Sequence, residues 1–344
     1  MDKDLKNKTL DELEALAENF GQKKYLAKYI FTFIHSKDVG KISNITPLSK
    51  AFRNQLTEQG YYLSHLNTIR TLSDPDGTIK YLFELADGSR IEKVLLPDGK
   101  RKTLCVSTQA GCSMSCAFCA TAKLGFSRNL TAAEIVDQIN VIQKNTGKIN
   151  NVVYMGMGEP LLNYGAVIKS IRILNHPLGK NIGLRHLTIS TCGITEGIRK
   201  LADEDIHPRL AISLNAPTDS LRLKIMPINK KYPVAELMNA AKYYFKRTKN
   251  RLTFEYILIA GINDSKKEAE KLSRLVDGLP CKINIIPYNT TDKKYTHPTE
   301  DKINRFVQPF LPMNVVISVR RSKGSEINAA CGQLYYKSIT ETTP

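Results

Sequence analysis

The sequence has no long apolar run. Its 344 residues are 42% hydrophobic and 24% charged, which is typical of a globular protein with a sizeable core. No segment approaches the roughly 20 apolar residues that a transmembrane helix needs. The stretch Met1-Asp-Lys-Asp-Leu-Lys-Asn-Lys8 is hydrophilic and carries acids, so we expect no signal peptide. These absences predict a protein of the cytoplasm that has no membrane partner.

The sequence also lacks repeats, low-complexity segments and long linkers, and its length suits one large domain with a small one. Histidine is scarce, and the spacing of the histidines is not that of metal ligands. We therefore expect ordinary structural roles for all of them: His35, His65, His176, His186, His207 and His297.

Three of the seven cysteines stand close together, with no fourth cysteine near them. They form the run Cys112-Ser-Met-Ser-Cys116-Ala-Phe-Cys119. In a cytosolic protein, cysteines are reduced, metal-bound or catalytic more often than they form permanent disulfides. A structural zinc site is closed by four ligands, and an iron–sulfur cluster usually takes four thiolates. Three thiolates would leave one iron of a four-iron cluster open, which indicates chemistry more than scaffolding.

The chain carries a formal net charge of +17. Such a field attracts polyanions, and nucleic acid is the partner that it favours. For any single pair of basic residues, a solvated helix face is the more ordinary interpretation, and it is the summed charge that favours nucleic acid. The basic residues are dispersed along the chain, at Lys23-Lys24, Lys100-Arg101-Lys102, Lys230-Lys231, Lys246-Arg247, Lys266-Lys267, Lys293-Lys294 and Arg320-Arg321.

The N-terminal part reads as a small helical domain over residues 1–62. Thr9-Leu-Asp-Glu12 has the form of a capping box, residues 25–34 are apolar at helical spacing, and Thr46-Pro47 resembles a helix start. Basic and aromatic residues alternate in this domain, which suits either an RNA-binding face or a core that simply contains the aromatics. The residues concerned are Lys23, Lys24, Tyr25, Lys28, Tyr29 and Phe31.

The remaining chain predicts an α/β fold. Residues 63–100 read as a β extension, because turn signals such as Asp74-Pro-Asp-Gly77 separate β-rich runs. From about residue 101 strands alternate with helical patterns, one of which starts at the capping box Thr131-Ala-Ala-Glu134. Six βα units predict a parallel sheet curved into a partial (β/α)6 barrel over residues 101–335, with 336–344 as a tail. The strand candidates are 104–107, 151–155, 186–190, 209–214, 254–259 and 282–286, with 315–319 as a seventh.

The cysteine triplet, with Phe118 before its last cysteine, resembles the cluster loop of radical S-adenosylmethionine (SAM) enzymes. Met155-Gly-Met-Gly-Glu-Pro160 follows the second strand, where such enzymes carry a related motif. Further segments resemble the family of dual-specificity RNA adenine-C2 methyltransferases of the RlmN type. They are Ser107–Cys112, Ala120–Gly125, Gly156–Asn163, Ala211–Pro217, Met226–Lys231 and Ala329–Leu334.

This resemblance implies one [4Fe-4S] cluster and SAM as cofactors. Cys112, Cys116 and Cys119 would hold the cluster, and its open iron would chelate SAM. Gly158 and Glu159 would meet the methionyl ammonium, which can only donate hydrogen bonds. Further SAM contacts are implied for Ser190, Ser213, Leu214, Asn215 and Asn289, where a histidine is common at the position of Asn215.

The resemblance also implies roles for a second pair of cysteines. Cys331 would take a methyl group from one SAM, and a 5′-deoxyadenosyl radical from a second SAM would activate it for addition to adenine C2. Glu92 would accept the C2 proton, although Cys105 is an alternative acceptor. Cys105 would then attack Cys331 through a transient disulfide. By residue type alone, Cys105 reads as a core cysteine, Cys331 as a stray loop thiol and Glu92 as a surface carboxylate.

The implied activity is methylation of C2 of an adenosine in 23S rRNA, at the peptidyl transferase centre, and of the adenosine 3′ of the tRNA anticodon. An electron donor such as flavodoxin and a monomeric state are expected with it. Three alternatives stay open: methylation of adenine C8, as in the antibiotic-resistance branch, a radical SAM reaction on a substrate other than RNA, and a non-enzymatic iron–sulfur or zinc protein that binds RNA.

Two further expectations concern residues near the site. Cys192 and Cys281 read as packed structural thiols. The basic loop Arg320-Arg-Ser-Lys-Gly324 is expected to contact RNA phosphate, since it shortly precedes Cys331, although a solvated loop would look the same.

Overall fold

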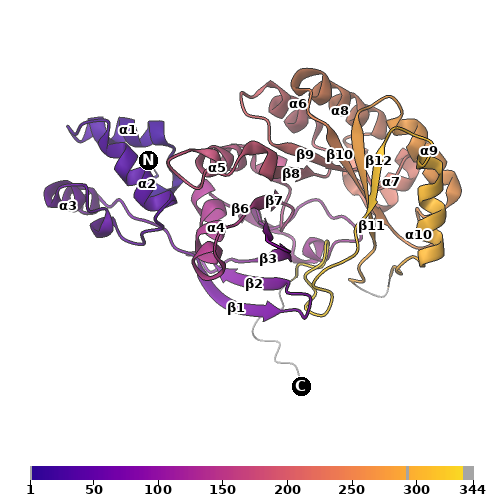
Figure 1. The fold of residues 1–344 in the computed structure, drawn as a ribbon, viewed down its shortest axis with the longest axis horizontal. Coiled ribbons are helices and arrows are strands. Elements are labelled where there is room, and N and C mark those ends of the chain that lie inside the picture. Colours follow the sequence, from indigo (N-terminus) through magenta and orange to yellow (C-terminus); the bar gives the residue numbers. More distant parts are fainter. Residues whose placement is uncertain (1, 292–293, 336–344) are drawn as a thin grey trace.

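A ten-stranded sheet forms the centre of the protein (Figure 1). The structure is a computed structural model that describes residues 2–291 and 294–335. Neighbouring strands follow the order β1-β2-β3-β4-β7-β8-β9-β10-β11-β12, and no pairing of β12 with β1 occurs among the described residues. The sheet is therefore an open, partial barrel. A two-stranded sheet of β5 (Gln109–Gly111) and β6 (Phe126–Asn129) lies beside it.

The part of the sheet from β4 to β12 is parallel and matches the predicted βα units. Its strands are β4 (Arg101–Cys105), β7 (Asn151–Tyr154), β8 (Leu187–Thr191), β9 (Arg209–Ser213), β10 (Leu252–Leu258), β11 (Cys281–Pro287) and β12 (Val316–Val319). The helices between them are α4 (Ala132–Thr146), α5 (Tyr164–Asn175), α6 (Thr195–Asp203), α7 (Asp219–Ile225), α8 (Val234–Thr248), α9 (Lys266–Val276) and α10 (Glu300–Val307). Figure 1 shows these helices on the outer side of the curved sheet.

Local sequence explains why these elements form. Strand β11 is almost continuously buried, as expected of a strand covered on both faces. The capping box at Thr131 and Glu134 is present at the start of α4, where each residue bonds to the other's backbone N–H. These two predictions, a buried parallel strand and a capped helix, are confirmed.

The predicted β extension is present as three antiparallel strands, β1 (Asn67–Ser73), β2 (Ile79–Glu84) and β3 (Arg90–Asp98). β3 pairs with β4, so the extension widens the main sheet and places its side chains beside the first parallel strand. The turn Asp74–Gly77 joins β1 to β2, as its sequence predicts.

The N-terminal helices α1 (Leu10–Asn19), α2 (Leu26–His35) and α3 (Lys50–Glu58) form one end of the molecule, beside α4 and α5 (Figure 1). The predicted helix start at Thr46-Pro47 is wrong. Those residues form a turn, and Ser49 caps α3 by accepting a hydrogen bond from the Phe52 N–H. A buried ion pair joins this end to the core, with Lys6 Nζ 2.6 Å from Asp137 Oδ1.

The structure separates the two readings of the aromatic residues in this domain. Phe31 is 1% exposed and belongs to the core, whereas Tyr25 is 51% exposed and Tyr29 is 42% exposed. The two tyrosine rings contact each other edge to face, with centroids 6.3 Å apart. An exposed aromatic pair flanked by lysines therefore lies on α2. No helix of the described residues is both long and apolar enough to span a membrane.

Candidate active site

A cavity of about 160 Å³ lies beyond the carboxyl ends of the parallel strands. Active sites of parallel α/β folds lie at this edge. Its lining residues come from the cysteine loop, from the five strands β7 to β11 and from the segment that follows β12. The predicted site residues that line it are Cys112, Cys116, Cys119, Gly158, Glu159, Ser190, Ser213, Asn215 and Cys331. Glu92, Cys105, Leu214 and Asn289 lie outside this lining.

The cysteine loop is folded so that its three thiols face one cavity. The Cys112 N–H donates to Gly125 O at 2.7 Å, and Ala117 N–H donates to Ile225 O at 2.9 Å. Burial raises the pKa of Cys112 to about 11. Burial also raises the pKa of Cys116, and the neighbouring thiolates of Cys119 and Cys112 raise it further. Such a group of thiolates needs a cation to hold it in the ionised form.

The donor set fits a cluster with bound iron. Soft thiolates are the ligands that iron–sulfur clusters take, and a positively charged cluster would offset the mutual repulsion described for Cys116. No group of three His, Cys, Asp or Glu side chains in the described ranges is arranged to hold a metal ion by itself. Cys112, Cys116 and Cys119 would be the residues that hold a cluster, and SAM would occupy the cavity beside it.

The glycines of the Met155–Pro160 segment allow the close approach of two backbones. A Cβ atom on Gly156 would lie 2.7 Å from Ser107 Oγ and from the Val106 carbonyl. Gly158 has φ +99°, and a Cβ atom there would lie 2.5 Å from Gln109 Cβ. Only glycine adopts this conformation without strain. These two positions therefore fix the strand end against the start of the cysteine loop.

Glu159 is buried at the cavity wall, where three protein hydrogen bonds fix it. Its Oε2 accepts the Cys192 N–H at 2.7 Å, its Oε1 accepts the Leu161 N–H at 3.0 Å, and its own N–H donates to Gln109 Oε1 at 2.8 Å. Burial raises the pKa of this carboxyl, and the hydrogen bonds from Cys192 oppose the rise. A cationic ligand group would favour its ionised form in the same way.

The ends of β8 and β9 supply the polar part of the wall. Ser190 and Ser213 line the cavity. Asn215 also lines it, in a left-handed conformation with φ +58°. The Asn215 side chain already has a hydrogen bond within the protein, because its Oδ1 accepts the Ile257 N–H at 2.8 Å. Leu214 is fully buried in the core, and its backbone N–H donates to Glu255 O at 3.0 Å.

Cys331 lies in a loop that is tied to the cysteine loop. The Ala120 N–H donates to Gly332 O at 2.7 Å, and Thr121 Oγ1 donates to Leu334 O at 2.7 Å. Cys331 is exposed. Many protein atoms nevertheless surround it, and the resulting loss of hydration raises the pKa of its thiol, with Glu255 raising it further. The loop therefore places Cys331 at the cavity, beside the cysteine loop.

Cys105 ends β4 and is electrostatically coupled to Cys331. Burial raises the pKa of the Cys105 thiol, and the charge of Cys331 raises it further. All seven cysteines are free thiols in the structure, so no disulfide joins this pair. The structure thus brings Cys105 and Cys331, which are far apart in the sequence, close enough for their charges to interact. Cys281 is 3% exposed and Cys192 is 8% exposed, which agrees with packed thiols, although Cys192 also touches the cavity.

Glu92 is buried on β3, so the expectation of a surface carboxylate from residue type alone is wrong. It is 4% exposed. Cys105 pairs with Val94 across the β3–β4 ladder, and because side chains alternate along a strand, Glu92 lies on the same face as Cys105. Burial raises the pKa of Glu92, while Lys80 lowers it. A carboxylate on the same face of the sheet as Cys105 has the chemistry of a proton acceptor.

Comparisons with known proteins agree with this geometry. Residues 106–273 match the radical SAM superfamily, and residues 3–61 match the ribosomal RNA large subunit methyltransferase N-terminal domain. The chain is 46% identical to a probable dual-specificity RNA methyltransferase RlmN of Thermoanaerobacter sp. (strain X514) over 338 residues, which cover 98% of this chain and 99% of the relative. It is 42% identical to the dual-specificity RNA methyltransferase RlmN of Geotalea uraniireducens over 96% of each chain.

The chain belongs to the RlmN family of radical SAM methyltransferases. A crystal structure of a radical SAM methyltransferase from Sphaerobacter thermophilus superimposes with a TM-score of 0.91 at 41% identity, covering 97% of this chain and 99% of that one. The fold expected from the sequence is therefore confirmed, and this RlmN-type chain is a methyltransferase whose superfamily uses a [4Fe-4S] cluster and SAM.

Sequence reasoning missed two residues of this RlmN-type site. Glu255 on β10 is 4% exposed and lines the cavity, with Oε1 bound by Asn284 Nδ2 at 2.9 Å and no hydrogen-bond partner for Oε2 in the structure. Arg222 on α7 is fully buried and donates to the carbonyls of Leu214 and Cys192 at the ends of β9 and β8. The sequence signal that could have identified Glu255 is a glutamate inside an otherwise apolar strand. No sequence signal identifies Arg222.

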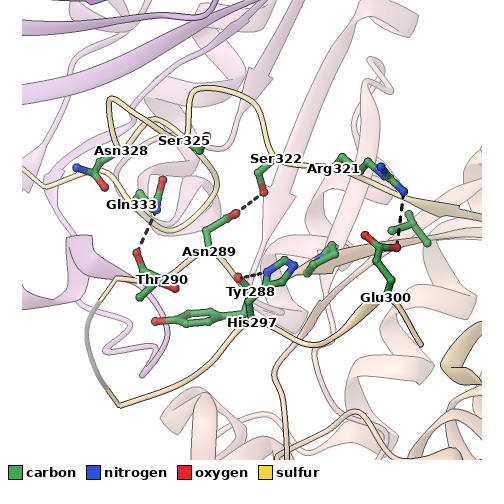
Figure 2. Close-up of a pocket in the computed structure, with 12 residues that line it drawn as sticks. Tyr288, Asn289, Thr290, His297, Glu300, Arg321, Ser322, Ser325, Asn328 and Gln333 are labelled. Carbon is green, nitrogen blue, oxygen red and sulfur yellow. Dashed lines mark hydrogen bonds and ion pairs between the residues drawn. The ribbon is translucent and has the colours of Figure 1, made fainter. Parts of the chain in front are cut away.

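Asn289 lines a second cavity of about 510 Å³, together with Ser325, Asn328 and Gln333 of the segment that carries Cys331. Figure 2 shows its side chain directed toward Ser322, which donates to Asn289 Oδ1. Its Nδ2 donates to Cys331 O at 3.3 Å, and Gln333 Nε2 donates to Thr290 O at 3.1 Å. In the structure, Asn289 therefore supports the loop that carries Cys331.

Proposed function

We propose that this protein methylates C2 of adenosine in RNA. Its substrates are an adenosine of 23S rRNA at the peptidyl transferase centre and the adenosine 3′ of the tRNA anticodon. The observation that carries the proposal is the convergence of the cysteine triplet, the Gly158-Glu159 turn and Cys331 on one cavity. The RNA substrates are supported by the names of the relatives, which are dual-specificity RNA methyltransferases.

Cys112, Cys116 and Cys119 hold the cluster in this proposal. When bound, the cluster supplies the electron that cleaves SAM to methionine and a 5′-deoxyadenosyl radical. The Glu159 carboxylate and the Gly158 carbonyl accept hydrogen bonds from the SAM ammonium, and Ser190 with the 213–215 strand end contacts the rest of SAM. Asn289, which lines the second cavity, would serve this set indirectly, because its Nδ2 donates to Cys331 O and so supports the Cys331 loop.

Cys331 is the methyl carrier and Cys105 is the resolving thiol. The Cys331 thiol first loses its proton. The thiolate then attacks the methyl carbon of one SAM, so a sulfur–carbon bond forms on Cys331 while the carbon–sulfonium bond breaks and S-adenosylhomocysteine leaves. Loss of a hydrogen atom from the S-methyl group to the radical leaves a methylene radical, which bonds to adenine C2, a carbon too electron-poor to attack a sulfonium itself. Glu92 then accepts the C2 proton, and the odd electron of the adduct would return to the oxidised cluster. Attack of the Cys105 thiolate on Cys331 sulfur breaks the sulfur–carbon bond to RNA, the released carbon takes up a proton to become the methyl group, and a transient disulfide forms.

The turnover requires two SAM molecules, one for the methyl group and one for the radical. It also requires reduction of the Cys105–Cys331 disulfide and an electron donor such as flavodoxin. The target base must be exposed or flipped out of its stack to reach C2. The helical domain 1–62 contributes RNA contacts, for which the exposed Tyr25 and Tyr29 pair on α2 is the available aromatic surface. The protein acts as a monomer in the cytoplasm.

The Cys105→Ala variant tests this proposal. Because the variant lacks the resolving thiol, the anaerobically reconstituted enzyme should accumulate a covalent protein–RNA adduct through Cys331, detected as a shifted band and by mass spectrometry of the peptide. The matched control is Cys281→Ala, a buried thiol of β11 outside the site, which should give methylated RNA and no adduct. About four irons per chain are expected in both.

If the Cys105→Ala variant leaves all RNA free and unmodified, the roles given to Cys105 and Cys331 are contradicted. One tightly bound zinc per chain, in place of iron, would contradict the enzymatic proposal as a whole. If the product carries its methyl group on C8, the C2 assignment is wrong while the radical mechanism stands.

A further inference from the structure

Lys80 is a buried lysine that contacts two parts of the proposed active site. It lies on β2 and is 7% exposed. Its ammonium is 3.2 Å from Glu92 Oε1 and donates to Asn328 O at 3.3 Å. Asn328 belongs to the loop that carries Cys331. One cation thus joins the proposed proton acceptor to the segment that holds the proposed methyl carrier.

A lysine is rarely placed in such a position without a specific partner. Taking an ammonium and a carboxylate out of water is costly, and the pair repays that cost only with good geometry and further hydrogen bonds. Both conditions are met around Glu92. Its Oε1 faces Lys80, and its Oε2 accepts the Tyr335 N–H at 2.8 Å. The carboxylate is therefore held between β2 and the segment that follows Cys331.

The contact of Lys80 with Asn328 is one of several that hold the Cys331 loop on the β extension. Asp76 Oδ2 accepts the Gly324 N–H at 2.8 Å, and Asp74 Oδ2 accepts the Glu326 N–H at 3.0 Å. Lys323 Nζ donates to Pro97 O at 2.7 Å. The loop would keep these three contacts without Lys80. Glu92 has no other ion-pair partner among the described residues, so Lys80 matters more to Glu92 than to the loop.

We propose that Lys80 is a positioning residue that fixes the Glu92 carboxylate in its ionised form against the loop of Cys331. The role rests on the proposed function, because it requires Glu92 to accept the C2 proton after the methylene group on Cys331 has bonded to the base. Lys80 does not touch the reacting atoms. It acts through Glu92, and only the step after adduct formation depends on it.

The test compares Lys80→Met with Lys93→Met in the reconstituted enzyme. Lys93 is a buried lysine of the neighbouring strand β3, and its amino group donates to Gln138 O at 2.8 Å. Both variants lose a buried amino group on the same sheet, but only Lys80→Met loses the partner of Glu92. Lys80→Gln, which keeps a donor for Asn328 O, provides the same comparison with less disturbance of the fold.

In Lys80→Met and Lys80→Gln, we expect S-methylcysteine at Cys331 and 5′-deoxyadenosine within about threefold of wild type. Adduct resolution should slow about tenfold or more, since proton transfer by a positioned base contributes at least this much. Lys93→Met should resolve the adduct at the wild-type rate. The measurements are mass spectrometry of the Cys331 peptide in the purified protein and the decay of the adduct over time.

The pH dependence separates loss of positioning from loss of fold. Lys80 on β2 and Arg70 on β1 are the charged groups that lower the pKa of Glu92 against the effect of burial. Without Lys80 the pKa of Glu92 rises further, so the base is ionised only at higher pH. The rate of adduct resolution by the Lys80 variants should therefore approach the wild-type rate as pH increases, whereas a partly unfolded enzyme would lose every step at every pH.

Resolution at the wild-type rate in a Lys80 variant with methylated Cys331 would overturn the role of Lys80 and leave the proposed function intact. A proportional fall of all steps, without pH recovery, would overturn it as well. The proposed function, and the role of Lys80 with it, would instead be overturned by two results in protein that keeps Lys80. The first is the absence of S-methylcysteine at Cys331, and the second is the absence of a protein–RNA adduct in the Cys105→Ala variant.

Discussion

At the scale of single residues, the site is built from side chains that are held by protein contacts before any ligand arrives. Glu159 has both carboxylate oxygens fixed by backbone N–H groups. Arg222 is fully buried and donates hydrogen bonds to backbone carbonyls at two strand ends. Positions fixed in this way lose little conformational entropy on ligand binding, because they were ordered during folding. The same rigidity makes the glycines of this turn sensitive to substitution.

Gly158→Ala is expected to weaken SAM binding strongly and to destabilise the protein by about 1–3 kcal/mol, the usual range for backbone strain at such a position. The added Cβ atom would lie 2.5 Å from Gln109 Cβ at a φ of +99°, so either the turn or Gln109 must move, and Gln109 holds the Glu159 N–H. Equilibrium dialysis with SAM and chemical denaturation measure the two effects.

Gly165→Ala is the control for that substitution. Gly165 lies in α5, and a Cβ atom there would meet no heavy atom within 4 Å. The free energy of unfolding of the Gly165→Ala variant should stay within about 1 kcal/mol of wild type, and its affinity for SAM should be unchanged. Equal SAM affinity in Gly158→Ala and Gly165→Ala would contradict the role assigned to the turn.

At the scale of elements, the β extension serves as a platform for the Cys331 loop. The turn between β1 and β2 holds that loop through Asp74 and Asp76. The double variant Asp74→Ala/Asp76→Ala should therefore loosen the loop, and Cys331 should react several-fold faster with an alkylating reagent. The measurement is the rate of Cys331 alkylation followed by peptide mass spectrometry.

Asp87→Ala is the matched control in the next turn of the same extension. Asp87 accepts the Ser89 N–H at 3.0 Å and pairs with Arg128, and neither contact involves the Cys331 loop. Its Cys331 alkylation rate should equal that of wild type. A double variant with unchanged alkylation would show that the extension does not restrain the loop.

The elements themselves could be predicted well where a local pattern decides them. Both capping boxes, at Thr9 and at Thr131, are present, and the parallel strands follow the predicted order because each is an apolar run bounded by a helical pattern. The predicted helix start at Thr46-Pro47 is wrong because Ser49 is a competing N-cap, whose side chain accepts a hydrogen bond from the Phe52 N–H. A choice between two neighbouring caps depends on packing that no local sequence signal records.

The site could be predicted only where residues of unusual spacing gather in the sequence. The cysteine triplet and the Gly158-Glu159 turn were visible in this way, and the structure places them on one cavity. The burial of Glu92, its ion pair with Lys80 and the orphaned oxygen of Glu255 could not be predicted. They depend on strand register and on the return of the chain end to the sheet, which are long-range features of the fold.

At the scale of the whole molecule, the charge of +17 and the helical domain fit a polyanionic substrate. The exposed tyrosine pair on α2 lies at the end of the molecule that Figure 1 shows beside α4 and α5. Long-range attraction of this kind provides affinity without selecting a sequence. The choice of one adenosine must then come from the cavity and the Cys331 loop.

The most direct test of the central claim is mass spectrometry of nucleosides from 23S rRNA and tRNA of cells that lack this protein. The account predicts loss of 2-methyladenosine from both RNAs and its return when the wild-type chain, but not Cys331→Ala, is restored. Retention of 2-methyladenosine in both RNAs would contradict the proposed function.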